Sequence, residues 1–291
     1  MIAMRNCLLE LRLLLREKLL WGFLAAFLVL NLLLVHLNLP GANAGWELDE
    51  LLPELLALSL RLLYHKLLPA VLAESLFLCF WTVLAGLERE RVARTVPISY
   101  STRVGRGMAK NRIAAGLICA SLAWIVLFGA ALACFLALCP ARESLNLSFS
   151  ALEWPDGRPW YGSFPGHAAA CGMLLWGILL AFGLLAGAAG LLFRNAFSAF
   201  LSLAALAALW LLSVRFCPGE PAAWQWPLVW NPANILFRFE DGQLILRLDA
   251  WFLRNDGACL SGLEPETVGT WALIGAGLFC AAWRGFCKKE M

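Results

Sequence analysis

The 291-residue sequence has few charged residues and almost no net charge. Asp, Glu, Lys and Arg make up 15% of it, against roughly 25% in an ordinary soluble domain. Because 61% of the residues are hydrophobic, this shortage of charge excludes a water-soluble globular protein. The 23 Lys plus Arg and 20 Asp plus Glu leave a net charge of only +3, so no nucleic-acid partner is expected.

The sequence also lacks the motifs of common enzymes. It contains no Gly-rich phosphate loop ending in Gly-Lys-Ser/Thr, so ATP is not expected to bind to this chain. It has no HExxH zinc motif, no CxxC pair and no Gly-x-Ser-x-Gly turn. Its three histidines are isolated, at His36, His65 and His167. We therefore expect no catalytic residue, no metal site and no cofactor in this chain, which is not predicted to be an enzyme.

Long apolar runs are what the sequence has instead. About 20 apolar residues are enough for a helix to cross the hydrocarbon core of a bilayer. Six segments meet this length, at about 19–38, 67–87, 113–139, 168–193, 196–214 and 267–283. The sequence thus predicts an all-α integral membrane protein in which residues 19–291 form a six-span transmembrane domain.

Positive charge indicates the orientation of these spans. If the N-terminus is cytoplasmic, the inner segments hold 15 of the 23 Lys and Arg residues. Cytoplasmic loops carry such an excess, so both termini are predicted to be cytoplasmic. Ala42-Asn43-Ala44 has the form of a secretory cleavage site, but the apolar run before it exceeds the 7–15 residues of a signal core. We expect that span to stay uncleaved.

Residues 1–18 are predicted to form an amphipathic helix along the inner membrane surface. At the 3.6-residue period, the leucines and the arginines of this segment gather on two different faces. The leucine face is predicted to contain Leu8, Leu11 and Leu15, and the arginine face Arg5, Arg12 and Arg16.

The outer segment 215–266, before the last span, has structural signals of its own. Its tryptophans favour the membrane interface, and its prolines argue against a further straight span. Asp241-Gly242 between alternating apolar residues predicts a hairpin turn, although an amphipathic helix fits nearly as well. Cys217 and Cys259 are the only cysteines well inside one outer segment, where an oxidising compartment allows a disulfide between them.

Two features inside the spans can each be interpreted in two ways. Glu74 is the only Asp, Glu, Lys or Arg within a span, and a charge at mid-bilayer costs at least about 2.5 to 3.5 kcal/mol. It either lines a translocation path or is hydrogen-bonded to another helix. Gly183-Leu-Leu-Ala-Gly187 allows close helix packing, either within the chain or between two copies of it.

The inner segment 88–112 carries a resemblance to a known family. Acidic residues end the second span, and a proline, an arginine and a lysine follow before the third span. This segment resembles the inner loop of ABC-2 type permeases, which forms a coupling helix that enters a cleft on an ATPase subunit. The resemblance assigns coupling to the ATPase to Glu88, Glu90, Pro97, Arg103 and Lys110.

The rest of the chain resembles these permeases in architecture. They begin with an inner amphipathic elbow helix, have six spans with both ends inside, and carry a long outer segment in which Asn-Pro often appears, as in Asn231-Pro232 here. The resemblance implies a permease subunit of an ATP-driven exporter in a bacterial cytoplasmic (inner) membrane. It implies a second permease subunit, surrounding lipid, and separate ABC ATPase subunits that bind ATP and Mg²⁺.

Two other functions remain open at this point. The same scaffold suits a membrane assembly or maturation factor for haem or a respiratory complex, which the Trp-rich outer segments and the three histidines would fit. A membrane-embedded enzyme is less favoured, because no paired catalytic groups are visible. The apolar walls do not identify a substrate.

Overall fold

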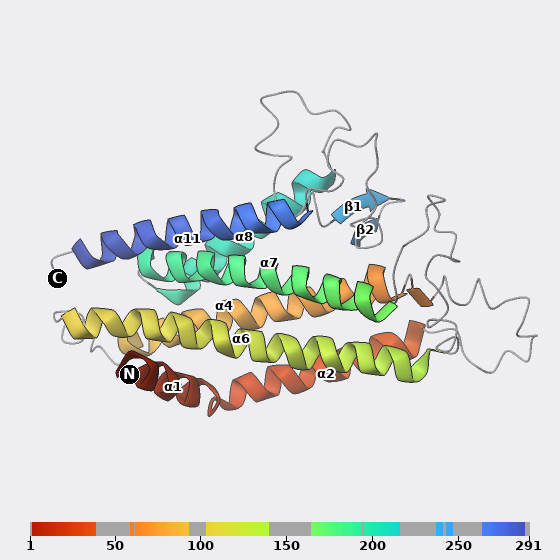
Figure 1. Cartoon of the computed structure of the whole chain (residues 1–291), viewed down its shortest axis with the longest axis horizontal. Helices are drawn as coiled ribbons and strands as arrows, with labels where there is room; N and C mark the ends of the chain where they lie inside the picture. The colour runs from red at the N-terminus through yellow and green to blue at the C-terminus, as the bar shows by residue number, and fades with distance from the viewer. Residues whose placement is uncertain are drawn as a thin grey trace, which may run out of the picture.

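The computed structural model describes residues 2–38, 59–60, 62–92, 103–139, 164–193, 195–215, 237–240, 243–246 and 264–288. Most of its helices run along one long axis (Figure 1). Pro97, Cys217 and Cys259 lie outside the described residues, so the predicted disulfide and one predicted coupling residue remain predictions.

The described segments are eight helices and two strands. In chain order they are α1 (Ile2–Leu14), α2 (Lys18–Asn38), the π-helical segment η1 (Leu62–Leu67), α4 (Leu68–Val92), α6 (Arg103–Leu138), α7 (Phe164–Leu192), α8 (Ala196–Arg215), β1 (Phe237–Glu240), β2 (Gln243–Leu246) and α11 (Glu264–Lys288). Each of the six predicted spans coincides with one of the longer helices.

Five of the described helical segments are long and apolar enough to cross a membrane. They are Lys18–Asn38, Leu62–Arg89, Gly107–Leu138, Phe164–Leu192 and Val268–Lys288. The apolar part of α8, Ala196–Leu212, is shorter, and at about 1.5 Å per residue it falls short of the roughly 30 Å hydrocarbon core. Helices of this length and composition define an integral membrane protein.

On the side that the sequence predicts to be cytoplasmic, two helices extend beyond the ends of the predicted spans. α4 continues to Val92, and α6 begins at Arg103, about ten residues before the predicted third span. Most of the predicted loop 88–112 is therefore helical, and only residues 93–102 of it lie outside the described part. Hydropathy locates the end of an apolar run, whereas Glu, Arg and Lys are good helix formers that let a helix continue beyond it.

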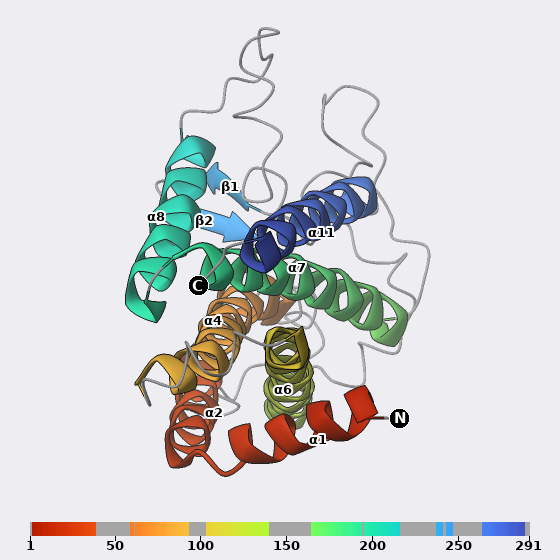
Figure 2. The same cartoon turned by 90° about the vertical axis from the view of Figure 1, so that its left-hand side faces the viewer.

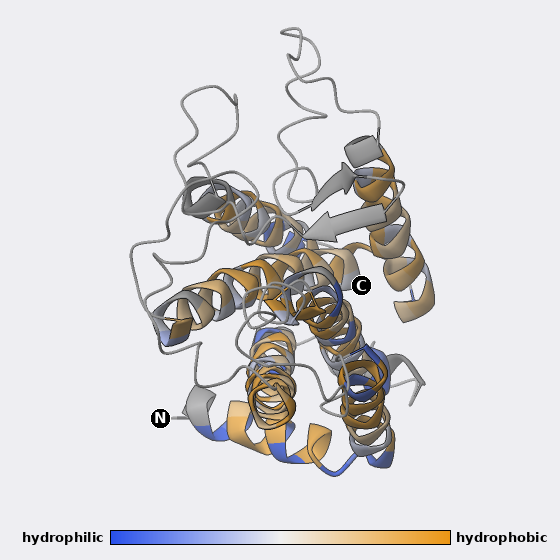
Figure 3. Cartoon of the chain, turned by 90° about the vertical axis from the view of Figure 1, so that its right-hand side faces the viewer, coloured by the Kyte–Doolittle hydropathy of each residue, from blue (hydrophilic) through white to orange (hydrophobic). Residues whose placement is uncertain are grey.

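α1 crosses the bundle instead of running along it. Figure 2 shows α1 passing across α6, which is seen nearly end-on, and ending near the start of α2. Figure 3 shows hydrophilic and hydrophobic residues alternating along α1. The N-terminal helix and the end of α11 lie at the same end of the bundle (Figure 1). We call this end the inner end, following the charge distribution of the sequence.

The buried face of α1 differs from the predicted leucine face. Leu11 and Leu15 pack against the core as expected, but Leu8 is 57% exposed. The centre of the buried face is formed by Glu10 and Leu14, which are 6% and 1% exposed. The apolar pattern alone misplaces this face because a charged residue belongs to it.

The predicted hairpin is confirmed at the opposite end of the molecule. β1 and β2 are antiparallel, with Phe237 opposite Leu246 and Glu240 opposite Gln243. In the sequence, Asp241 and Gly242 are the two residues between the strands, and they lie outside the described residues. β1 contacts α8 and β2 contacts η1, so the hairpin lies against the outer ends of two helices.

Small residues bring the central helices together. A Cβ atom added at Gly116 of α6 would lie 2.8 Å from the Val83 Cα of α4, and the Thr82 hydroxyl donates a hydrogen bond to the Gly116 carbonyl at 3.1 Å. Gly183 of α7 faces Leu117 and Cys79, and Gly187 faces Ile113 and Phe279. The GxxxG string therefore serves packing within this chain.

Aromatic contacts hold the short helix α8 to its neighbours. The ring of Trp210 lies 5.5 Å from Phe182 of α7 and 4.7 Å from Trp271 of α11, in edge-to-face geometry. Phe200 makes a similar contact at 6.3 Å with Phe80 of α4. Such pairs each contribute about 0.5 to 1.5 kcal/mol beyond burial.

The contact between α4 and α6 predicts that Gly116→Ala destabilises the protein. The added methyl group meets backbone, which cannot rotate away, and overpacking of this kind costs about 1 to 3 kcal/mol. The expected result is a lower melting temperature of the detergent-solubilised protein. Gly129→Ala is the matched control on the same helix, since nothing lies within 4 Å of its added Cβ. Equal melting temperatures for the two variants would contradict the close approach.

Candidate functional site

A buried ion pair joins α1 to α6 at the inner end. The Arg112 Nε atom donates to a Glu10 carboxylate oxygen at 3.1 Å, and both side chains are 8% exposed. Removing one partner of a buried ion pair leaves an uncompensated charge and costs about 3 to 5 kcal/mol. This pair therefore gives α1 a defined position on the bundle.

A second ion pair joins the end of α4 to the turn between α1 and α2. Arg89 Nη2 donates to the Glu17 carboxylate at 2.6 Å and to the Leu13 carbonyl at 3.3 Å. The two side chains are 29% and 41% exposed, so water screens this pair more than the first one. Together the two pairs attach α1 to both helices that flank residues 93–102.

Glu88 connects α4 to the beginning of α8. Its carboxylate accepts a hydrogen bond from the Ala196 backbone N–H at 3.0 Å, while the Asn195 side-chain oxygen accepts one from Ser198 N–H at 2.6 Å. Carboxylates stabilise helix N-termini, where N–H groups are unpaired and the helix dipole is positive. The predicted coupling residue Glu88 thus also holds two helices together.

Three other predicted coupling residues, Glu90, Arg103 and Lys110, lie at the same end. The Lys110 ammonium is 4.3 Å from the centre of the Trp283 ring, a cation–π contact between α6 and α11. Glu90 lies in α4 and Arg103 begins α6, and their side chains are outside the described set. None of these positions tests contact with an ATPase, so the coupling role remains a prediction.

Glu74 makes a buried contact with the first span. The Asn31 amide of α2 donates a hydrogen bond to the Glu74 carboxyl of α4 at 2.7 Å, and the two residues are 3% and 6% exposed. The residues lining the two cavities described below do not include Glu74. The hydrogen bond to another helix expected for Glu74 is therefore present, and a role of Glu74 in a translocation path stays a prediction.

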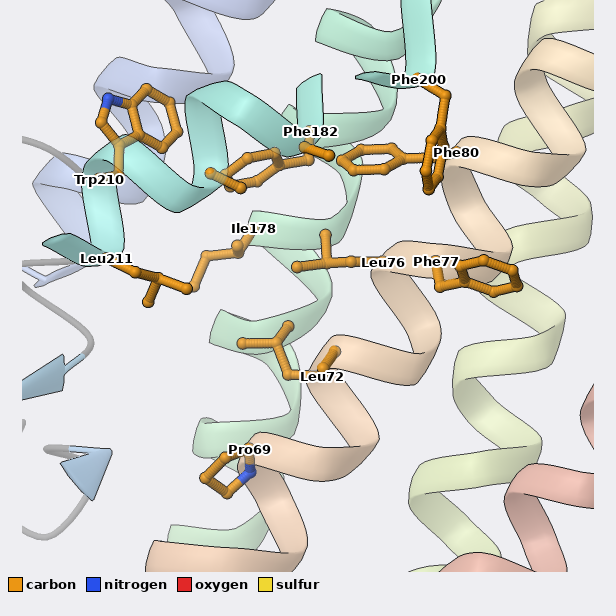
Figure 4. Close-up of a pocket in the computed structure, with 13 residues that line it drawn as sticks. Pro69, Leu72, Leu76, Phe77, Phe80, Ile178, Phe182, Phe200, Trp210 and Leu211 are labelled. Carbon is orange, nitrogen blue, oxygen red and sulfur yellow. The ribbon is translucent and has the colours of Figure 1, made fainter. Parts of the chain in front are cut away.

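Two cavities follow one another along α4 and α8. The outer one has a volume of about 280 Å³ and is lined only by apolar residues, from Pro69 to Trp210 (Figure 4). The inner one, of about 580 Å³, extends from Phe77 and Phe200 to Glu88 and Arg89. Phe77 and Phe200 line both cavities, and their rings are 6.2 Å apart in edge-to-face geometry.

Sequence reasoning missed most of the polar contacts. It did not single out Asn31, although an amide within an apolar run is a visible signal. It also missed the acidic partners of the inner end, Glu10 and Glu17, which are the only acidic residues in a basic segment. Their basic partners, Arg89 and Arg112, contribute to the sequence prediction only through the excess of positive charge that indicates the orientation of the spans.

Comparison with protein families, curated proteins and solved structures found no match to this chain. The class of the protein therefore follows from its helices alone: it is an integral membrane protein of the α-helical kind.

The buried ion pair predicts that Glu10→Gln releases α1. Burial and the nearby Glu10 carboxylate raise the pKa of the Cys7 thiol on the same helix, which slows its alkylation. The variant should make Cys7 react faster with a maleimide, as measured by peptide mass spectrometry, and should lower the melting temperature.

Arg12→Gln is the matched control for this experiment, because it removes an exposed charge from the same helix. Arg112→Gln separates release of α1 from loss of the Glu10 charge, because it keeps the carboxylate that raises the pKa of Cys7, and exposure of α1 should still speed the labelling of Cys7. Unchanged Cys7 labelling in both buried-pair variants would show that the pair does not hold α1.

The Asn31–Glu74 contact predicts a measurable coupling between α2 and α4. Interhelical hydrogen bonds in membranes average about 0.6 kcal/mol and reach about 1.7. A double-mutant cycle with Asn31→Ala and Glu74→Ala, read by reversible unfolding in detergent, should give a coupling energy in this range. Glu74→Gln should retain most of the stability, because its carbonyl still accepts from Asn31. Strictly additive single changes would contradict the contact.

Proposed function

We propose that this chain is the transmembrane permease subunit of an ATP-binding cassette exporter of the ABC-2 type, in a bacterial inner membrane. It couples ATP hydrolysis by a separate ATPase subunit to the movement of a substrate across the membrane. The observation that carries the proposal is the attachment of the crosswise helix α1 to both helices flanking residues 93–102.

The contacts of the inner end suit the transmission of a mechanical signal. A partner that pushes on residues 93–102 acts directly on the ends of α4 and α6. Through Arg112–Glu10 and Arg89–Glu17 the displacement reaches α1, and through Glu88 it reaches α8. Rigid-body movement of packed helices is a common switching mode, and these contacts link four helices, α1, α4, α6 and α8, at one end.

In the proposed mechanism, ATP binding closes the ATPase subunits and moves the inner ends of α4 and α6. Two permease subunits rock against each other and open a path between them. No nucleotide is bound by this chain in the mechanism, which agrees with its lack of a phosphate-binding loop. Its own residues transmit the movement and form the apolar walls along which a substrate passes.

The decisive experiment identifies the partner. The tagged chain is extracted from its native membrane in a mild detergent, and the bound polypeptides are identified by mass spectrometry. A stoichiometric partner with a phosphate-binding Gly-Lys-Ser/Thr loop is expected. Its absence under conditions that preserve other membrane complexes would refute the proposal, and a haem spectrum in the same sample would favour the assembly-factor function.

The coupling assignment predicts that Arg103→Glu and Lys110→Glu uncouple ATP hydrolysis from export. Reversal of charge at the ATPase-facing segment should lower export at least about tenfold, because a lost charge-assisted contact is worth about 1.5 to 3 kcal/mol. Membrane insertion should be unchanged. The measurement is export in cells together with ATPase activity of the purified complex.

Trp283→Leu separates coupling from packing in this test. It removes the cation–π contact of Lys110 while leaving the lysine charge in place, so it should lower stability without abolishing export. Normal export by both charge-reversal variants would remove the coupling assignment, whether or not an ATPase partner is found.

A further inference from the structure

The contact between α2 and α4 leaves two buried oxygen atoms without a hydrogen bond. Asn31 Nδ2 donates to Glu74 Oε2 at 2.7 Å, but Asn31 Oδ1 and Glu74 Oε1 are buried and have no partner among the described residues. The two unpaired oxygens belong to the same amide and the same carboxyl group that already share one hydrogen bond. Since a buried acceptor without a donor is unfavourable, this contact lacks one hydrogen atom.

The surroundings of Glu74 are unsuited to a negative charge. Glu74 lies near the middle of the apolar segment Leu62–Arg89, and a charge at mid-bilayer is costly. Neither ion pair of the described residues includes Glu74, so the Asn31 amide is the polar group in contact with its carboxyl. One hydrogen bond from a neutral amide does not replace the hydration that an ionised carboxylate loses on burial.

We propose that Asn31 and Glu74 form a proton-binding site between the first and second spans. Glu74 Oε1 carries the proton, and this O–H group donates to Asn31 Oδ1, parallel to the hydrogen bond from Asn31 Nδ2 to Glu74 Oε2. A protonated carboxyl offers one donor and one acceptor side by side, and a side-chain amide offers the complementary pair. The two planar groups close a ring of two hydrogen bonds, and both unpaired oxygens obtain a partner.

The number of available oxygens favours a proton over a metal cation as the occupant. Ca²⁺ takes about six to eight oxygen ligands and Mg²⁺ about six. The buried side-chain oxygens without a partner in the described part of the chain are Asn31 Oδ1, Glu74 Oε1 and Ser75 Oγ, which are too few for such a shell. The backbone carbonyls of α2 and α4 accept hydrogen bonds within their own helices. A proton needs only one atom to carry it and one acceptor.

Other titratable groups on the helices packed against α4 do not bind the Glu74 carboxyl. Apart from the charged groups of the inner end, they are Lys18 and His36 on α2, Tyr64, His65 and Lys66 on η1, Cys79 on α4 itself, Cys119 and Cys134 on α6, His167 and Cys171 on α7, and Arg215 on α8. In the described segments none of these forms an ion pair or a hydrogen bond with Glu74. The proton is therefore held by the amide–carboxyl pair alone.

Loss of the proton places two hydrogen-bond acceptors opposite each other. Glu74 Oε1 would then be a carboxylate oxygen beside the carbonyl oxygen of Asn31, with no donor between them and an unsolvated charge. The proton therefore strengthens the attachment of the first span to the second. The inference rests on this contact and does not require an ATPase partner, so it is tested on the isolated chain.

The test is infrared spectroscopy of the purified full chain in detergent at about pH 7. A protonated carboxylic acid has a C=O stretching band separate from those of carboxylates, so wild type should show a neutral carboxyl band that Glu74→Gln loses. Glu74→Gln should fold, because its amide can make both hydrogen bonds to Asn31. Glu17→Gln is the matched control, which removes a partly exposed carboxylate and should leave the band unchanged. Loss of a carboxylate band alone in Glu74→Gln would overturn the proposal.

Asn31→Leu tests the position of the proton. It keeps the Glu74 carboxyl but removes both of its hydrogen bonds, so the neutral carboxyl band should move to higher frequency. Asn38→Leu is the matched control on the same helix, because the Asn38 side chain bonds the Leu34 carbonyl and Lys66 instead. An unshifted band in Asn31→Leu would show that the proton does not lie between these two residues.

The pH dependence of stability gives an independent readout. Between about pH 5 and 7 an exposed glutamate of the unfolded chain is ionised, whereas the folded chain holds the proton. Stability therefore falls as pH rises, and the folding equilibrium constant of wild type should lose up to about tenfold per pH unit relative to Glu74→Gln. Parallel pH curves of the two proteins would contradict the proposal. So would a stabilisation of wild type by sodium chloride over choline chloride that Glu74→Gln lacks, since it would identify a metal cation as the occupant.

Discussion

The buried ion pair between Glu10 and Arg112 is the contact on which the inner end of the molecule depends. Each of these charges loses several kcal/mol of hydration on burial, and their attraction to each other offsets part of that loss. α1 therefore docks on α6 in one register, with Glu10 facing Arg112 at 3.1 Å. That register places the end of α1 where Leu13 and Glu17 meet Arg89 of α4. Glu88, one residue earlier, then lies against the beginning of α8.

The apolar part of the molecule is held together differently, because burial of apolar surface gives no driving force in lipid. Close packing and a few hydrogen bonds take its place. Gly116 lets α6 approach the backbone of α4, and the glycines of α7 accommodate side chains from α4, α6 and α11. The Asn31–Glu74 hydrogen bond adds a polar contact between α2 and α4. Contacts of this kind have partners on particular helices, and so they determine which helices are neighbours.

α4 connects the charged inner end to the apolar cavities. The same helix contributes Glu88 and Arg89 to the inner contacts and Phe77 and Phe80 to the cavity walls. In the proposed mechanism, movement of its inner end changes the spacing between α4 and α8, and with it the contact between Phe77 and Phe200. This arrangement is the physical basis of our proposal that an ATP-driven movement acts on an apolar path.

The sequence by itself determined the features that depend on neighbouring residues. Apolar length predicted the spans, and Asp241-Gly242 predicted the hairpin turn, because hydropathy and turn chemistry act over a few residues. Only the tertiary structure decided which face of α1 is buried and which helices pack against Gly183 and Gly187. It also decided where α4 ends and α6 begins on the inner side. It also decided the partners of Glu74 and Arg112, which are 43 and 102 residues away in the chain. A local pattern records that a residue is polar or small, but its partner is specified by how distant segments pack.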